Sequence, residues 1–356
     1  MKIQDLQSLY AHLPQIAALA KLVGDKSVKT ISLDGLLASA APMVFSALAL
    51  KSSARLLFVL QDAEEAGYFY HDLCQVMGDK QVLFFPSSYR RAVKYGQKDP
   101  ASEILRTEVL TSIHPSPFTL HQSLYIVTCP EAIAEMVVTR KLLDDRTLSL
   151  TQGQTVSVDS ICKTLRDFGF REVDYVYEPG QFALRGSILD VYSFSHEFPF
   201  RIDFFGDEID SLRTFEVETQ LSKERTDRVD IVPELTSVEE KESILKFLPD
   251  DTLLVAKDFQ FVRESIERIY QEGFSQQALK ERLETATEME QREIEKEMQR
   301  DSQLITGSQF NADAEPFRKI YLGGKWKEAL GRRTLATEGT QESGKRSEIS
   351  NLKPQI

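Results

Sequence analysis

The sequence predicts an α/β protein in which a parallel-sheet domain is interrupted by a small α+β domain that carries an antiparallel sheet. Two observations lead to this fold class. Short, continuous apolar runs alternate with helical segments over the first part of the chain, as in βαβ units around a buried parallel sheet. Residues 169–220 instead hold closely spaced apolar runs bounded by turn residues, as in antiparallel strands.

Composition limits the classes of protein that the chain can belong to. Its 356 residues are enough for two or three domains, and a net charge of -12 argues against a dedicated duplex-binding protein. The 3 cysteines and 5 histidines are scattered, so we expect no catalytic residue, metal or cofactor. The N-terminus lacks a signal peptide, and the apolar stretch 35–50 is too short to span a bilayer. We therefore expect a cytoplasmic protein without a membrane partner.

The first α/β domain follows from the order of its elements. Residues 6–23 have helical periodicity, with Pro14 as a local break. Strands are predicted at 28–33, 55–60, 81–86 and 124–129, and helices at 35–50, 64–77 and 103–113. Because these strands alternate with helical segments, residues 1–145 are predicted to form one parallel sheet with covering helices.

The first strand-to-helix turn is where a phosphate-binding loop is expected. Such a loop needs two glycines, a lysine and a hydroxyl at fixed spacing. Residues 32–41 keep only Gly35, and Asp34 adds a negative charge where phosphates would lie. We therefore interpret this turn as a helix start packed against the sheet, and ATP binding is the disfavoured alternative.

Residues 87–102 form a locally basic segment. Its basic and aromatic residues are Tyr89, Arg90, Arg91, Lys94, Tyr95 and Lys98. This combination is compatible with contact to single-stranded nucleic acid. A solvated loop is the favoured interpretation, and direct DNA contact by residues 89–98 stays open.

The second domain is predicted from residues 146–233. Asp159 is placed to cap a helix that ends at Gly169. Three apolar runs follow, FALRGSILDVY, FRIDFF and LRTFEV, bounded by Pro179-Gly180, Ser193–Pro199 and Gly206-Asp207. The predicted product is a helix with a small antiparallel sheet.

One face of this sheet carries the residues that suggest binding. Alternation in the run 200–205 places Arg201, Asp203 and Phe205 on the face opposite the core. Arg185 and Arg213 lie on neighbouring runs, and we call this surface the arginine face. Arginines beside aromatic rings are favoured in protein interfaces. A solvated face with ordinary cross-strand ion pairs is the alternative.

The α/β pattern returns after residue 234. Helical segments are predicted at 243–249, 258–272 and 277–301, and a strand at 252–256, which we expect to complete the first sheet. The charged helix 277–301 is expected to pack on one side only, which we favour over a coiled-coil partner. Trp326 is expected to mark the last packed turn, and residues 331–356 to be a linker or disordered. The predicted domains are thus 1–145 (1a), 146–233 (2), 234–330 (1b) and the tail 331–356.

The second domain also shows a resemblance. GQFALRGSILDVY, followed by RIDFFGDEIDSLRTFEVETQ, resembles the second domain of UvrB, the nucleotide-excision-repair helicase subunit. It resembles even more the matching domain of the bacterial transcription-repair coupling factors. The resemblance extends over roughly residues 1–325 and is strongest over 169–220. It implies that the first domain is a degenerate P-loop, RecA-like domain that has lost its ATP chemistry.

In both families this domain docks the UvrA protein. The contact residues that the resemblance implies here are Arg171, Arg185, Tyr192, Arg201, Asp203, Phe205 and Arg213. The family's proteins continue with an RNA-polymerase-binding domain and an ATP-dependent DNA translocase, neither of which is visible in this sequence. RNA polymerase and DNA are therefore implied as partners of the full-length protein, and this chain is expected to be a fragment or a shortened relative.

The sequence-based hypothesis is a non-catalytic interaction module that recruits UvrA to stalled RNA polymerase in transcription-coupled nucleotide excision repair. Other domains of the full protein would mask its docking surface until it is needed. The alternative is a UvrB-like ATP-dependent DNA helicase subunit of the excinuclease. The missing Walker lysine argues against it, and so does the connection 87–102, which is too short and too charged for the Tyr-rich DNA-clamping hairpin of UvrB. A DNA-binding module acting through residues 89–98 is a third hypothesis, which the acidic composition disfavours.

Overall fold

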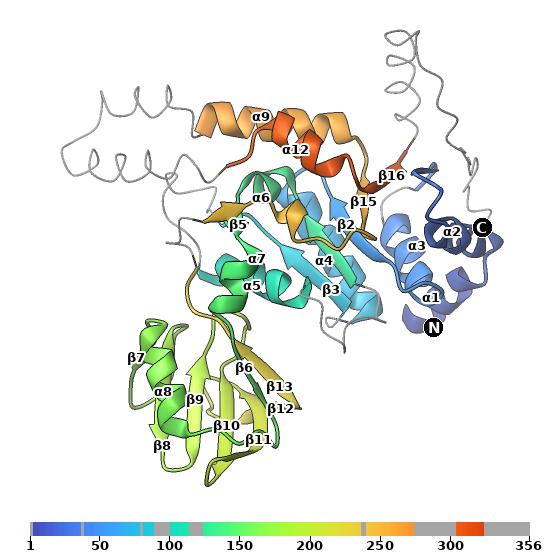
Figure 1. Ribbon diagram of the computed structural model, residues 1–356. Helices are drawn as coiled ribbons and strands as arrows, with labels where there is room; N and C mark the ends of the chain where they lie inside the picture. Colours follow the sequence, from blue (N-terminus) through green and yellow to red (C-terminus); the bar gives the residue numbers. More distant parts are fainter. Residues whose placement is uncertain are drawn as a thin grey trace. The chain divides into compact units, whose positions relative to one another are not determined.

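The computed structural model divides into two compact units (Figure 1). The first unit comprises Met1–Gly96, Pro115–Met136 and Ser243–Ile356, and the second Gln97–His114 and Val137–Glu242. The structure describes residues 3–36, 39–78, 81–88, 100–113, 124–235, 240–273 and 304–323. The predicted basic segment 89–98, the helix 277–301, Trp326 and the tail 331–356 lie outside these ranges.

A six-stranded parallel sheet forms the centre of the first unit, in the order β1-β16-β15-β2-β4-β3. Its strands are β1 (Thr30–Leu33), β2 (Arg55–Val59), β3 (Val82–Phe85), β4 (Leu124–Thr128), β15 (Leu253–Ala256) and β16 (Arg318–Leu322). Strands from the late part of the chain therefore lie between β1 and β2. The predicted α/β class is confirmed.

Helices cover both faces of this sheet. The helices of the first unit are α1 (Ile3–Ala11), α2 (Pro14–Gly24), α3 (Ala40–Ala49), α4 (Ala63–Met77), α6 (Pro130–Ala134), α9 (Phe259–Gly273) and α12 (Gly307–Ala314), with a short 3-10 helix η2 (Ile244–Lys246). The crossovers through α3 and α4 run across the sheet in one direction, and those through α6, α9 and α12 run in the other. Because parallel crossovers are right-handed, the two groups lie on opposite faces.

Local chemistry explains several element ends in the first unit. Pro14 separates α1 from α2, as predicted. Asp62 caps α4 by accepting a hydrogen bond from the Glu65 N–H at 2.9 Å. The helix predicted from residue 35 begins only at Ala40, because Gly35 has a φ of 83° and cannot continue a right-handed helix.

Two contacts in the first unit join segments that are far apart in the sequence. The Arg318 guanidinium, at the start of β16, donates to the carbonyl oxygens of Leu22, Val23 and Val28 at 2.8–2.9 Å. Gly307 begins α12 against α9, where an added Cβ would lie 2.6 Å from the Arg263 carbonyl oxygen. The helices α9 and α12 lie side by side (Figure 1). Gly307 permits this close approach because it has no side chain.

The second unit contains a six-stranded mixed sheet, in the order β12-β11-β10-β9-β8-β7. Its strands are β7 (Arg171–Glu172), β8 (Gln181–Arg185), β9 (Ile188–Tyr192), β10 (Phe200–Phe205), β11 (Glu208–Phe215) and β12 (Ser222–Thr226). The remaining elements of the unit are α5 (Pro100–Ile113), β5 (Val137–Val138), α7 (Arg140–Asp145), β6 (Leu148–Thr151), α8 (Val158–Asp167), β13 (Arg228–Ile231) and β14 (Lys241–Glu242). The strands of the sheet are antiparallel except for β7, which pairs in parallel with β8, so the prediction of an antiparallel sheet is correct for five of the six strands.

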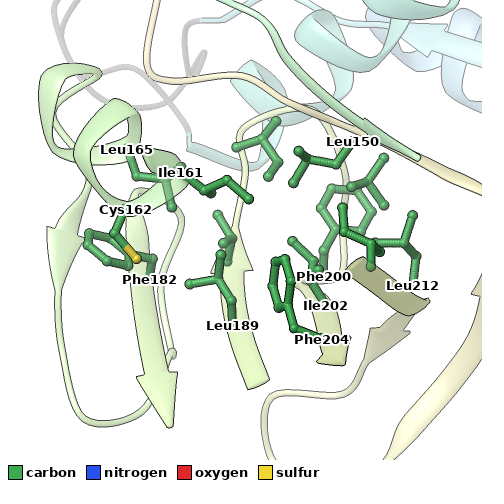
Figure 2. Packing of buried hydrophobic residues seen from close by; sticks show 14 of the residues in the cluster. Leu150, Ile161, Cys162, Leu165, Phe182, Leu189, Phe200, Ile202, Phe204 and Leu212 are labelled. Atoms are coloured by element: carbon green, nitrogen blue, oxygen red, sulfur yellow. The ribbon is translucent and has the colours of Figure 1, made fainter. Parts of the chain in front are cut away.

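The core of the second unit lies between α8 and one face of this sheet (Figure 2). Ile161, Cys162 and Leu165 point from α8 toward the sheet. Leu189 and Ile202 meet them from β9 and β10, and both are fully buried. Because successive side chains of a strand point to opposite sides of the sheet, the residues that alternate with these core residues lie on the other face.

One local prediction in the second unit is wrong. Asp159 does not cap α8: the N-cap residue is Ser157, and its side chain makes no capping hydrogen bond. The run FALRGSILDVY supplies both β8 and β9, because Gly186, with a φ of 61°, turns the chain into the β8–β9 hairpin. Among the described residues, no helix combines the length and the apolar character needed to cross a membrane.

Candidate partner-binding surface

The arginine face is confirmed as one side of the sheet in the second unit. Phe200, Ile202 and Phe204 are buried against α8, whereas Arg201 and Asp203 are partly exposed on the other side. The pairing register places residues of four strands in one row, with Asp190 opposite Arg201, Arg201 opposite Arg213, and Arg213 opposite Arg225. The row therefore carries three arginines on neighbouring strands.

Asp190 lies between Arg185 and Arg201 on the arginine face and is not among the site residues predicted from the sequence. Its side chain is fully buried, and its carboxylate accepts hydrogen bonds from Arg185 and from Arg201. Arg201 Nε donates to Oδ1 at 2.7 Å and Arg201 Nη2 to Oδ2 at 2.9 Å. Arg185 Nη2 donates to Oδ2 at 2.5 Å. One carboxylate therefore orients two of the predicted contact arginines.

The surroundings of Arg201 fix its side chain further. Its guanidinium carbon lies 4.3 Å from the centroid of the Phe215 ring. Its Nη1 donates to the Gln220 carbonyl oxygen at 3.1 Å. Hydrogen bonding to Asp190 raises the pKa of Arg201 above its ordinary value and outweighs the opposing effect of burial. Arg201 is thus a permanently charged and largely immobilised group.

A second ion pair lies beside the first. Arg213 Nη2 donates to Asp203 Oδ2 at 3.1 Å, and both side chains are about a quarter exposed. The Nε atom of Arg213 is buried and has no hydrogen-bond partner among the described residues. Ser187 Oγ also reaches Asp203, at 3.4 Å. Asp203 and Arg213, both predicted contact residues, are therefore joined.

Arg171 and Tyr192 lie apart from this network. Arg171 is on the edge strand β7, and its exposed guanidinium lies 3.9 Å from Glu178. The Tyr192 hydroxyl donates to the Glu197 carbonyl oxygen at 2.6 Å, and burial is the main cause that raises its pKa. In the part of the chain that the structure describes, no hydrogen bond or ion pair connects either residue to Asp190 or Asp203.

Aromatic side chains provide the exposed apolar surface beside the arginines. Phe205, the last residue of β10, is 82% exposed. Tyr175 lies under the Arg185 guanidinium, with 4.7 Å between the guanidinium carbon and the ring centroid, and it is half exposed. Strand alternation predicts Phe205 on this face but gives no sign of Tyr175, because the loop before β8 has no strand or helix periodicity. An arginine stacked on a half-exposed tyrosine, on a sheet that also carries an exposed phenylalanine, is a combination that protein interfaces favour.

The strand-to-helix turn at residues 32–41 is where the sequence disfavours a phosphate-binding loop. After β1 ends at Leu33, residues 34–36 form no helix or strand, and residues 37–38 lie outside the described ranges. Ser32 Oγ and Asp34 Oδ1 are buried and have no hydrogen-bond partner among the described residues.

The comparisons with known proteins point to the same part of the chain. Residues 148–236 match the family model described as the UvrB interaction domain. These residues contain α8 and all six strands of the sheet that bears the arginine face.

Curated relatives extend this similarity along the chain. The transcription-repair-coupling factor of Escherichia coli (strain K12) is 28% identical over 200 residues, which are 56% of this chain and 17% of the relative. That of Staphylococcus epidermidis is 26% identical over 240 residues, 67% of this chain and 20% of the relative. That of Bacillus subtilis (strain 168) is 26% identical over 208 residues, which are 58% of this chain and 17% of the relative.

The matched region of this chain spans 17–20% of the length of these relatives. The resemblance that the sequence shows most strongly over residues 169–220 is confirmed: residues 148–236 match the UvrB interaction domain, and the chain is similar over more than half of its length to transcription-repair-coupling factors.

Proposed function

We propose that the arginine face binds the UvrA protein and that the chain is a non-catalytic interaction module in transcription-coupled nucleotide excision repair. In this role it recruits UvrA to a stalled RNA polymerase. The observation that carries the proposal is the UvrB interaction domain match, because it covers the sheet that joins Asp190 to Arg185 and Arg201 and that carries Phe205 at the end of β10. The similarity to transcription-repair-coupling factors supports the pathway.

The geometry suits a protein partner better than an extended nucleic acid. Asp190 and Asp203 place two carboxylates among the arginines of the face. Carboxylates at these positions repel phosphates, whereas a protein surface can offer both acceptors and donors to such a pattern. The proposed UvrA contacts are Arg171, Arg185, Tyr192, Arg201, Asp203, Phe205 and Arg213.

Calorimetric titration of the chain with UvrA tests the proposal most directly through Phe205→Ala. This side chain is 82% exposed, so its removal leaves the core intact. Central aromatic residues of interfaces contribute about 2 kcal/mol or more, so binding is expected to weaken by at least about tenfold. Tyr68→Ala is the matched control, because Tyr68 is a 69% exposed aromatic residue on α4 in the other unit.

Two results would contradict the proposal. The unchanged chain fails to bind UvrA, or Phe205→Ala and Tyr68→Ala bind UvrA as tightly as the unchanged chain does. Folding of each variant is checked by circular dichroism before titration.

The proposal includes the absence of ATP chemistry from this segment. Support comes from Asp34 and from the missing lysine at residues 32–41. Titration with a fluorescent ATP analogue and Mg²⁺ is expected to show no saturable binding up to millimolar nucleotide. Micromolar binding would favour the alternative, a UvrB-like ATP-dependent helicase subunit.

The remaining partners belong to a longer protein of this kind. RNA polymerase and DNA are proposed to bind outside the present chain, since the aligned region covers 17–20% of the relatives. The ATP-dependent DNA translocase activity is placed there as well. The cytoplasm, where bacterial transcription takes place, is the proposed compartment.

A further inference from the structure

Among the described charged residues of the second unit, Asp190 stands out because it is completely buried. It lies on β9 between Leu189 and Val191, whose side chains enter the core on the opposite face of the sheet. A fully buried carboxylate is costly unless it is paired and hydrogen-bonded. The carboxylate of Asp190 receives three hydrogen bonds from two guanidinium groups.

The two arginines that bind Asp190 use their donors differently. A guanidinium has five N–H donors. Arg201 makes four described hydrogen bonds, to Asp190 and Gln220, and its side chain is 13% exposed. Arg185 makes two, to Asp190 and the Asp174 carbonyl oxygen, and its side chain is 33% exposed. Arg185 therefore keeps N–H groups that face solvent.

Both loops beside the face depend on these arginines. Arg185 Nη1 holds the loop before β8 through the Asp174 carbonyl oxygen at 2.9 Å, and this loop carries Tyr175. Arg201 holds the turn after β11 through Gln220. Loss of the common acceptor would free both guanidinium groups and the loops that they fix.

We propose that Asp190 is the positioning residue of the arginine face: it holds Arg201 as a fixed brace and aims the free N–H groups of Arg185 at a carboxylate of the partner. This inference rests on the proposed binding of UvrA and adds the chemistry of the contact. Arg185 is the accessible cation of the pair, and a planar guanidinium binds a carboxylate through two parallel hydrogen bonds. Preorganisation by Asp190 lowers the entropy that binding would otherwise cost.

The test compares Asp190→Asn with Val191→Ala in the full chain. Asparagine keeps the shape of the side chain but removes the charge and one acceptor oxygen. Val191 is the next residue on β9, is fully buried, and faces the core away from the arginine face. Both variants are expected to lower the unfolding temperature, and only the first is expected to disturb the arginines.

The binding readout is calorimetric titration with UvrA at a temperature where all variants are folded. Asp190→Asn is expected to weaken binding by about tenfold or more, and Val191→Ala by no more than about twofold. Equal binding by Asp190→Asn and the unchanged chain overturns the inference. The inference is also overturned if both variants bind UvrA more weakly in proportion to the stability that each has lost, because the role of Asp190 is then structural only.

A second readout does not depend on UvrA. In the unchanged chain, the NMR signal of the Arg201 Nε–H group is expected to exchange slowly with water, because Nε donates to Asp190 at 2.7 Å. Asp190→Asn is expected to speed this exchange, and Val191→Ala to leave it unchanged. If the unchanged chain does not bind UvrA, the proposed function fails, and this exchange measurement alone decides whether Asp190 positions the arginines.

Asp190→Glu replaces Asp190→Asn in this test if the asparagine variant does not fold. It keeps the negative charge and moves the carboxylate by one methylene. It is expected to fold and to bind UvrA more weakly than the unchanged chain. Binding as tight as that of the unchanged chain contradicts a positioning role.

Discussion

Arg201 and Arg213 are direct cross-strand partners on β10 and β11, so two positive charges face each other on the arginine face. Like charges in this relationship destabilise a sheet. Each guanidinium is paired with a different carboxylate, Arg201 with Asp190 and Arg213 with Asp203. The face is therefore an ordered array of alternating charges and not a simple basic patch.

Removal of Arg201 is expected to destabilise the second unit strongly. Arg201→Ala leaves the buried Asp190 with only Arg185 as its ion-pair partner. Breaking a buried pair in this way costs on the order of 3–5 kcal/mol. Urea unfolding followed by circular dichroism measures this loss. Arg171→Ala, which removes an exposed arginine 3.9 Å from Glu178, is expected to change stability by less than about 0.5 kcal/mol. Equal effects of the two substitutions would argue against a buried ion-pair centre.

Removal of Arg225 is expected to stabilise the second unit, whereas removal of Arg201 is expected to destabilise it. It is exposed on the edge strand β12 and is the cross-strand partner of Arg213. Arg225→Gln removes this repulsion and is expected to raise stability by a few tenths of a kcal/mol, that is about 0.2–0.5 kcal/mol. Thermal unfolding at low and high salt checks the cause, since screening by salt should abolish the gain. A gain that persists at high salt would exclude repulsion as its origin.

Gly307 is expected to tolerate no side chain. In Gly307→Ala the new Cβ would lie 2.6 Å from the Arg263 carbonyl oxygen and 3.1 Å from Glu267 Cβ. Because the nearest atom belongs to the backbone of α9, the two helices must separate, at a cost of about 1–3 kcal/mol. Gly24→Ala is the control, since no atom lies within 4 Å of its added Cβ. Unchanged unfolding of Gly307→Ala would show that α9 and α12 pack less closely.

Arg318 is expected to stabilise the first unit through three carbonyl groups. Arg318→Met keeps the aliphatic stem and removes the donors to Leu22, Val23 and Val28. The expected loss is on the order of 2–4 kcal/mol, because hydrogen bonds from charged donors are strong and three of them are removed together. Arg55→Gln, which breaks a pair with the half-exposed Asp251, is expected to cost less than about 1 kcal/mol. Thermal unfolding compares the two variants.

Glu108 on α5 is expected to make stability depend on pH. Burial, together with repulsion from Glu197, raises the pKa of Glu108 from 4.5 to about 7. In the window from pH 4.5 to 7 the folded chain therefore keeps a proton that the unfolded chain has lost. This contribution to stability is fully present below the ordinary pKa of 4.5 and is lost as the pH rises to the folded-state pKa of about 7.

Glu108→Gln removes this titration. The variant is expected to gain stability relative to the unchanged chain as the pH rises from 5 to 8, measured by the unfolding temperature. Glu178→Gln, which changes a 73% exposed side chain, is the control and is expected to leave the pH dependence unaltered. Parallel pH profiles for Glu108→Gln and the unchanged chain would contradict a raised pKa.

The sequence predicts the arginine face well because alternation in a strand is local. In the run 200–205 each second residue is apolar, and the burial of Phe200, Ile202 and Phe204 follows this pattern. Asp190 was missed because its partners are set by the pairing of β8, β9 and β10, which depends on the turn at Gly186. An aspartate between Leu189 and Val191 in an apolar strand was the available signal, since a charge at that position needs a partner.

The late part of the first unit was harder to predict. The helix α12 has only eight residues, begins with Gly307 and shows little periodicity. The strand β16 begins with Arg318 and Lys319, so its apolar run is short. Both elements are defined by distant contacts, with α9 and β1 respectively, and not by local preference.

The position of β16 between β1 and β15 has a consequence for biosynthesis. While the chain leaves the ribosome, β2, β3 and β4 can pair as soon as residue 128 has emerged. The strand β1 pairs with β16, and Arg318 at the start of β16 donates hydrogen bonds to the last carbonyls of α2. Neither contact can form until β16, which ends at Leu322, has been synthesised. A ribosome that stops between these points holds a nascent chain with an unpaired apolar strand near its amino terminus, which is a substrate for chaperones and proteases.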